Sequence, residues 1–274
     1  MVKASEREDF LARLAQAHPN PESELRWSTP FELLVAVVLS AQSTDKGVNV
    51  ATAVLFPVAN TPEAMVKLGV DGLIPYVKTI GLYRNKAKNI VALSQMLIER
   101  HGGVVPEDFD ALVALPGVGR KTANVVLNVA FRHPTMPVDT HVFRVANRTK
   151  FAPGKTPDEV EALLLKRVPQ RFALDAHHYL LLHGRYCCKA RSPECERCPV
   201  AIYCSAPEKK ARLEEFTPGI DAAQSAVLPS STDRKRSLCK SPSGVLLMHG
   251  SSRQPDFLQS KNVFAAFLQT AEPL

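Results

Sequence analysis

The sequence predicts an all-α fold, and three observations support that prediction. Apolar residues over the first 210 positions gather in stretches of helical length. Short breaks at proline, glycine and asparagine separate these stretches, and period-two alternation of strand length is scarce. With 274 residues, 45% hydrophobic and 22% charged, the chain is long enough for one large domain or two modest ones, each with a buried core.

The individual helices follow from the apolar pattern. An opening amphipathic helix is expected over 6–18, with Phe10, Leu11 and Leu14 on one face, and Pro19 ends it. The nearly continuous apolar run 31–39 predicts a central, buried helix. Further helices, each bounded by Pro, Gly or Asn, are predicted over 44–56, 61–67, 71–77, 83–101 and 108–115.

The composition changes after about residue 216 to serine, proline, glutamine and isolated apolar residues. Such a segment cannot bury enough surface to offset its ordering entropy, so residues 217–274 are predicted to form a mostly disordered tail. A short helix over 262–270 is the one element expected in it. The tail is expected to be an inert extension; the alternative is that its basic run 234–236 adds weak electrostatic attraction to nucleic acid.

Charge and hydropathy narrow the class of partner. A formal charge of +7 and a pI near 9.1 favour a polyanionic partner. The apolar run 31–41 falls short of the roughly 20 residues that span a bilayer, so no membrane association is expected. The N-terminus carries charges of both signs and no apolar signal region, so a reducing cytosol or nucleoid is expected.

The densest motif is Leu115-Pro-Gly-Val-Gly-Arg-Lys, which follows one predicted helix and opens another. Helix, Gly-x-Gly turn and helix make a helix-hairpin-helix. Gly117 and Gly119 let the chain turn tightly and bring backbone N–H groups against a phosphate at a helix N-terminus. Such a module binds DNA without reading its sequence. An ordinary helix connection is the alternative, and the adjacent basic pair favours DNA binding.

Lys121 and Asp139 are the candidate catalytic pair. On a helical wheel Lys121 points away from the apolar stripe of Ala123, Val126 and Leu127, so its amine must lie in solvent or in a cleft. Alone, it would be read as a phosphate contact. Asp139 is a good helix N-cap and can also face the lysine across a proline-containing turn. A lysine and an aspartate suffice for glycosidic substitution followed by Schiff-base elimination.

The cysteines form a second constellation. Cys188-x6-Cys195-x2-Cys198-x5-Cys204 offers four thiolates, the right number for a [4Fe-4S] cluster or a structural zinc, and the spacing alone leaves both open. Cys187 is left over and is expected to pack as a small hydrophobe, with Cys187 in place of Cys188 as a ligand as the alternative.

Taken together, these residues closely resemble the endonuclease III family of bifunctional pyrimidine-lesion DNA glycosylases. The resemblance rests on Leu115-Pro-Gly-Val-Gly-Arg-Lys-Thr-Ala-Asn, Val138-Asp-Thr-His, Leu39-Ser-Ala-Gln-Ser-Thr-Asp and the cysteine spacing. It runs from about residue 5 to about residue 210. Two specific motifs in the correct order make coincidence improbable.

The resemblance implies a two-lobed helix-hairpin-helix glycosylase fold. A six-helix barrel would comprise residues 22–132, with the hairpin at about 108–130. An iron-sulfur cluster lobe would join residues 1–21 to 133–210, and Cys188, Cys195, Cys198 and Cys204 would bind a [4Fe-4S] cluster. The partner would be double-stranded DNA containing damaged bases or abasic sites. A monomer is expected, cytoplasmic and associated with the bacterial nucleoid.

The resemblance also implies residue roles. Lys121 would attack C1′ of a flipped-out nucleotide, Asp139 would be the essential carboxylate, and Gln42 and Leu82 would fill the gap left in the duplex. Apart from the family, Gln42 reads as a polar helix-end residue and Leu82 as a core leucine. The expected DNA contacts are Gln42, Leu82, Leu115, Gly117, Val118, Gly119, Arg120, Thr140, His141, Lys189 and Arg191.

Three rival interpretations remain at this point. The adenine-mismatch glycosylase branch shares the hairpin and the cysteine spacing, but Lys121 at the nucleophile position and a short, polar tail argue against it. A non-catalytic DNA-binding protein would use the hairpin and metal only to hold DNA. A zinc protein would lack the visible colour of an iron-sulfur cluster.

Overall fold

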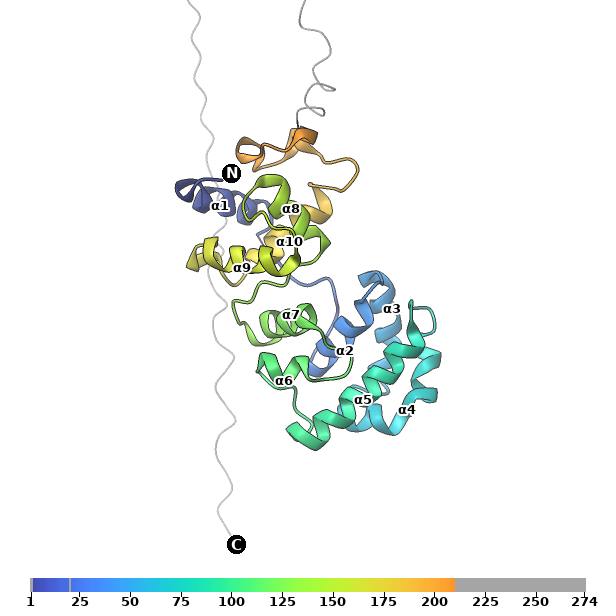
Figure 1. Ribbon diagram of the computed structural model, residues 1–274. Helices are drawn as coiled ribbons and strands as arrows, with labels where there is room; N and C mark the ends of the chain where they lie inside the picture. The colour runs from blue at the N-terminus through green and yellow to red at the C-terminus, as the bar shows by residue number, and fades with distance from the viewer. Residues whose placement is uncertain (1, 20, 210–274) are drawn as a thin grey trace, which may run out of the picture. The chain divides into compact units, whose positions relative to one another are not determined.

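The computed structural model describes residues 2–19 and 21–209, and the regular elements in these ranges are all helical, which confirms the predicted fold class (Figure 1). The predicted tail lies outside them. None of the helices in this part of the chain is long and apolar enough to cross a bilayer. The α-helices are α1 Arg7–Ala17, α2 Pro30–Ser40, α3 Asp45–Leu55, α4 Pro62–Val77, α5 Tyr83–His101, α6 Phe109–Val113, α7 Arg120–Phe131, α8 Thr140–Thr149, α9 Pro157–Arg167 and α10 Ala176–Tyr186. Short 3-10 turns are η1 Ala4–Glu6, η2 Gln170–Phe172, η3 Cys195–Arg197 and η4 Ala201–Tyr203.

Three helices begin with the same Thr-Pro pair. The hydroxyls of Thr29, Thr61 and Thr156 accept hydrogen bonds of 3.2 Å from the backbone N–H three residues further on. A proline follows each threonine, at a position where its missing N–H costs no helical hydrogen bond. These pairs therefore fix where α2, α4 and α9 start.

The break predicted between 61–67 and 71–77 is present inside α4. Gly69 has φ 70° and ψ 174°, a conformation that a side chain would strain, and it divides the helix at a kink.

The helices pack around two hydrophobic cores. The first core is built by α2 to α7, and α2 is at its centre, since residues from Leu33 to Leu39 are no more than 4% exposed. This confirms the predicted central helix. The second core is built by α1, α8, α9 and α10 (Figure 1). In it, the rings of Phe10 and Phe151 lie 4.9 Å apart between centroids, which joins the N-terminal helix to the C-terminal half of the chain.

Helices α8 and α10 approach each other closely at Gly184. A Cβ at this position would lie 2.8 Å from His141 Cβ and 3.0 Å from the His141 carbonyl oxygen, so only glycine fits. Arg144 of α8 also donates to the Gly184 carbonyl oxygen at 2.7 Å. The first turn of α8, which follows Asp139, is thereby held against α10.

Candidate functional site

Lys121 and Asp139, the predicted catalytic pair, line the same pocket. The pocket holds a cavity of about 80 Å³, and apolar side chains of α2, α7 and α10 form much of its wall. The two residues lie at the N-terminal ends of α7 and α8.

Lys121 is the second residue of α7 and is exposed, whereas Ala123, Val126 and Leu127 on the same helix are buried in the first core. The prediction that its side chain points away from the apolar stripe is confirmed. The amine is thus free of the core and available to a molecule in the pocket.

Asp139 is the N-cap of α8, as expected. Its Oδ1 accepts hydrogen bonds from the backbone N–H groups of His141, at 2.9 Å, and Val142, at 2.8 Å. Among the described residues, Oδ2 has no hydrogen-bond partner. One oxygen therefore fixes the carboxylate while the other remains available as a proton acceptor.

His177 of α10 lines the same pocket and was not singled out by the sequence. It is 3% exposed, and its Nδ1 has no hydrogen-bond partner. Burial holds the pKa of His177 well below its ordinary value, and the charges of His178 and Lys121 lower that pKa further. His177 is therefore a neutral ring beside the lysine at pH 7. Nothing in the local pattern of two adjacent histidines on a helix signals this position.

Arg185, at the end of α10, closes another side of the pocket. Its Nη1 lies 2.5 Å from Glu24 Oε2 and 2.9 Å from Asp45 Oδ2. Burial lowers the pKa of Arg185, but the two carboxylates outweigh it and the net pKa is raised. The three residues come from segments far apart in the sequence, so no local signal predicts the network.

The hairpin turn divides its residues between the core and the surface. Gly117 has φ 78°, and a Cβ there would lie 2.8 Å from Asn89 of α5. Gly119 is open, with no atom within 4 Å of an added Cβ. Leu115 and Val118 are 2% and 6% exposed, so their side chains belong to the core. Any DNA contact by these two residues must come from their backbone atoms.

Arg120 is already engaged within the protein. Its Nε and Nη2 donate to both oxygens of Glu161 on α9, at 2.9 and 2.7 Å, and Asn124 Nδ2 donates to the same carboxylate at 3.1 Å. Glu161 is 6% exposed, while the Arg120 side chain is 53% exposed. The arginine thus ties the hairpin to α9, a role that the sequence did not indicate, and keeps an exposed edge.

Gln42 and Leu82 lie in two loops with left-handed backbone. Their φ angles are 55° and 58°, a region that non-glycine residues seldom adopt. Leu82 is 58% exposed, so it is not the core leucine that its residue type alone would suggest. Both side chains are accessible from outside the protein.

The remaining predicted contacts are at the surface near α8 and the cysteine loop. Thr140 and Arg191 are exposed, and His141 is half-buried, with its Nδ1 3.1 Å from Arg144 Nη2. Lys189 forms an ion pair of 2.5 Å with Glu194. Lys189 is therefore partly neutralised, while Arg191 has no hydrogen-bond or ion-pair partner within the ranges that the structure describes.

The cysteines converge on one small pocket, with a cavity of about 20 Å³. It is lined by Cys188, Cys195, Cys198 and Cys204, together with Cys187. Four thiols that line a single pocket match the number and kind of ligands that a cuboidal iron-sulfur cluster needs.

Geometry alone also offers a different set of ligands. One ligand atom each from His183, Cys187 and Cys198 lies within 4.8 Å of the others. Cys187 is buried, however, and its thiol donates to the Glu194 carbonyl oxygen at 3.5 Å. The predicted role of Cys187 as a small packed residue agrees with that burial.

Two causes raise the pKa of the Cys198 thiol to about 12: its hydrogen bond with Cys187, which has the larger effect, and its burial. The thiol therefore keeps its proton at pH 7 in the metal-free chain. Since metals bind the thiolate, loading the site releases this proton.

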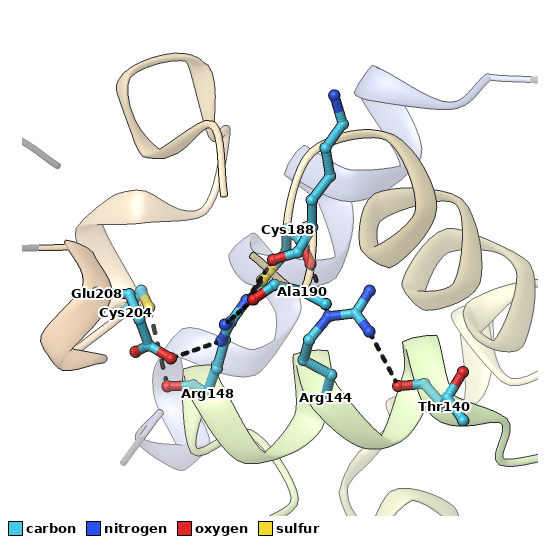
Figure 2. Close-up of polar contacts among 8 residues, drawn as sticks. Thr140, Arg144, Arg148, Cys188, Ala190, Cys204 and Glu208 are labelled. Atoms are coloured by element: carbon cyan, nitrogen blue, oxygen red, sulfur yellow. Dashed lines mark hydrogen bonds and ion pairs between the residues drawn. The ribbon is translucent and has the colours of Figure 1, made fainter. Parts of the chain in front are cut away.

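Arg148 of α8 holds the loop that follows Cys188 (Figure 2). Its guanidinium donates to the carbonyl oxygens of Lys189 and Ala190, at 2.6 and 2.9 Å, and Nη1 lies 3.7 Å from Cys188 Sγ. Its Nε pairs with Glu208 at 3.0 Å. One side chain thus joins three successive residues of the cysteine loop to α8.

Two families match parts of the chain. Residues 35–170 match the family described as HhH-GPD superfamily base excision DNA repair protein. Residues 188–204 match the iron-sulfur binding domain of endonuclease III. The second match begins at Cys188 and ends at Cys204, so it contains the four predicted ligands and leaves Cys187 outside.

Whole proteins match over nearly the same region. Endonuclease III of Escherichia coli (strain K12) is 59% identical over 208 residues, which are 76% of this chain and 99% of the relative. Endonuclease III of Haemophilus influenzae (strain ATCC 51907 / DSM 11121 / KW20 / Rd) is 58% identical over 208 residues, with the same coverage of both chains.

Solved structures give the same result. A trapped covalent intermediate of endonuclease III with DNA superposes with a TM-score of 0.73 at 45% identity, covering 78% of this chain and 100% of that one. A non-covalent endonuclease III–DNA complex superposes with a TM-score of 0.73 at 44% identity and the same coverage. A thermostable thymine-DNA glycosylase, at 23% identity and a TM-score of 0.65, shares the fold; it covers 76% of this chain and 98% of that one.

Proposed function

The chain belongs to the endonuclease III family, and we propose from that premise that it excises oxidised pyrimidines from duplex DNA through Lys121. It is a base-excision repair DNA glycosylase with associated AP lyase activity, and it carries an iron-sulfur cluster. We propose in addition which class of lesion it removes and which residues perform each step.

The observation that carries the proposal is the shared pocket of Lys121 and Asp139. The neutral amine of Lys121 attacks C1′, a C–N bond forms, and the glycosidic bond breaks. The bonding electrons leave with the base, which takes up a proton. The sugar ring then opens to a Schiff base between Lys121 and C1′. The open Oδ2 of Asp139 is suited to accept the proton that the amine must release.

Strand cleavage follows from the Schiff base. The imine acidifies the hydrogens on C2′, and removal of one proton drives elimination of the 3′ phosphate. Water then hydrolyses the conjugated imine and restores Lys121. The buried His177 ring beside Lys121 is neutral at pH 7, so it adds no charge next to the amine.

The base must leave the helical stack before Lys121 can reach C1′. Gln42 and Leu82 are suited to fill the vacated space because both are exposed at the tips of fixed loops. An exposed leucine stabilises the gap by burial against neighbouring bases. Loss of pairing and stacking is smaller for a damaged base, which favours its extrusion over that of normal bases.

The phosphate backbone would be held by the open side of the hairpin. Gly117 and Gly119 present backbone N–H groups, and the exposed edge of Arg120 adds a positive charge. Leu115 and Val118 contribute through their backbone. Thr140 and His141 would add contacts from the start of α8, and Lys189 and Arg191 from the cysteine loop.

We assign Cys188, Cys195, Cys198 and Cys204 as the cluster ligands. Their common pocket and the extent of the family match support this set over one that includes Cys187. A bound cluster would fix the loop that carries Lys189 and Arg191. The cysteine loop would then act as a folded basic surface, and the two cores would correspond to lobes of residues 22–132 and 1–21 with 133–210.

Borohydride trapping tests the proposal. The cluster-loaded protein is incubated with a labelled duplex that contains thymine glycol or an abasic site, and reductant is added. A covalent complex with both substrates, abolished in Lys121→Gln while DNA binding remains, is the expected result. A complex with the abasic site alone would overturn the lesion class. Binding without a complex on either substrate would overturn the amine mechanism.

A further inference from the structure

Buried Lys86 lies between the two loops that carry Gln42 and Leu82. It is on α5, one turn after Leu82, and it is 5% exposed. Its ammonium donates to the Leu39 carbonyl oxygen at 2.8 Å and to Ser43 Oγ at 2.9 Å. Its own backbone N–H donates to the Leu82 carbonyl oxygen at 3.1 Å. One residue therefore contacts both loops.

The two loops also lie close to each other. A Cβ built on Gly81 would lie 3.5 Å from the Gln42 carbonyl oxygen and 3.9 Å from Ser43 Oγ. A side-chain methyl group at Gly81 would thus be in ordinary van der Waals contact with the Gln42 loop, so the two loops are close neighbours. A shift of one loop would therefore change the packing of the other.

Both loops hold a strained backbone. Gln42 and Leu82 have left-handed φ angles without being glycine, a conformation that persists only when its surroundings enforce it. The ammonium of Lys86 bonds the last turn of α2 and Ser43, directly on either side of the Gln42 segment. These bonds are positioned to enforce the conformation.

The environment of Lys86 is unusual for a lysine that serves stability alone. Within the part of the chain that the structure describes, it forms no ion pair, and burial lowers its pKa. A buried ammonium with only neutral acceptors is costly compared with an apolar side chain of the same length. Fixing the loops is a benefit that would offset this cost.

We propose that Lys86 is a positioning residue that locks the Gln42 and Leu82 loops together, so that both side chains enter duplex DNA as one unit. The inference rests on the proposed function, because it assumes that these two side chains fill the space of an extruded base. It predicts that Lys86 matters most where a base must leave a duplex.

The test compares Lys86→Met with Lys88→Met, which removes an exposed ammonium from the same helix. Single-turnover base removal is measured on a duplex with thymine glycol opposite adenine. Strand cleavage is measured on a single-stranded abasic oligonucleotide, which has no opposite base and no stack to fill. Lys86→Met is expected to slow the duplex reaction about tenfold to a hundredfold, as for lost orientation, and to leave the single-strand reaction within about twofold. Lys88→Met should match the wild type on both.

A double-variant cycle with Leu82→Ala separates positioning from general stability. If Lys86 acts through Leu82, the double variant loses little more duplex activity than Leu82→Ala alone. Equal losses on the two substrates, multiplicative losses in the cycle, or no loss at all would overturn the inference. If Lys86→Met does not fold, Ser43→Ala removes one of its two acceptors, and the same preference for duplex loss is expected. Wild-type protein inactive on both substrates would instead contradict the proposed function.

Discussion

Arg148 Nη1 lies 3.7 Å from Cys188 Sγ, and the same guanidinium holds the two carbonyl groups that follow this cysteine (Figure 2). A cationic donor near a thiolate stabilises negative charge on sulfur and limits its exposure to oxidants. Arg148 therefore both stabilises negative charge on Cys188 and fixes the backbone of the cysteine loop.

Arg148→Met is expected to shorten the lifetime of the cluster. Loss of an outer-shell partner typically costs about tenfold to a hundredfold in metal affinity, so the visible absorbance should decay about tenfold faster in air. Arg100→Met removes an exposed arginine in the last turn of α5 and is the control. Equal decay of the two variants would mean that Arg148 has no influence on the cluster.

Asp139→Asn is expected to separate the capping role of this residue from its catalytic role. The asparagine oxygen can still accept from the N–H groups of His141 and Val142, and Asn caps helices as well as Asp, so the thermal midpoint should barely change. Loss of the proton acceptor should lower single-turnover base removal by about a hundredfold or more. An active, stable Asn variant would exclude general-base chemistry at this position.

The sequence predicted the local features of this site and missed the long-range ones. The Thr-Pro pairs, the Gly-x-Gly turn and the cysteine spacing are short patterns whose meaning depends on neighbours in the chain. Glu161 binds Arg120, which is 41 positions away, and Lys86 binds Ser43, which is 43 positions away. An isolated charged residue on a helix gives no sign of such a partner. The burial of Leu115 was likewise decided by packing against the first core.

Glu161→Ala is expected to loosen the hairpin from α9. The change leaves Arg120 and Asn124 without their shared acceptor, and hydrogen bonds to a charged group contribute about 1.5–3 kcal/mol. Because Arg120 is half-exposed, a loss near the lower end of that range is expected in urea unfolding. In a double-variant cycle with Arg120→Met, the two effects should be less than additive. Full additivity would show that the pair is not coupled.

Acid is expected to destabilise the protein through its buried histidines. Burial lowers the pKa of His18, His177 and His178 in the folded state. Unfolded histidines titrate near pH 6.5, so below about pH 6.5 the unfolded chain binds protons that the folded chain refuses. The free energy of unfolding should therefore fall as the pH drops from about 7.5 to about 5.5. The contribution of the neutral histidines to the free energy of unfolding is complete only about one pH unit above 6.5.

His177→Gln should flatten this pH dependence, because it removes the histidine whose pKa burial holds well below its ordinary value. Urea midpoints at several pH values, read from the fluorescence of the single tryptophan, Trp27, provide the measurement. Parallel profiles for the variant and the wild type would show that His177 does not contribute to acid sensitivity.

Replacement of the two hairpin glycines by alanine is expected to affect different properties: stability at Gly117 and DNA binding at Gly119. Gly117→Ala places a Cβ 2.8 Å from Asn89 in a left-handed backbone, so it should lower stability by about 1–3 kcal/mol. Gly119 has φ −98° and open space around its missing Cβ, so Gly119→Ala should cost less than about 1 kcal/mol. The added methyl group would, however, stand where a phosphate must approach the N-terminus of α7.

Gly119→Ala should therefore weaken binding to duplex DNA while its urea midpoint stays close to that of the wild type. Fluorescence anisotropy with a labelled abasic-analogue duplex measures the affinity, and Gly47→Ala, a glycine inside α3, controls for the loss of a glycine elsewhere. The affinity should fall for both specific and undamaged duplexes by a similar factor, because phosphate contacts carry no base information. A Gly119→Ala protein with wild-type affinity would place the DNA backbone somewhere other than this turn.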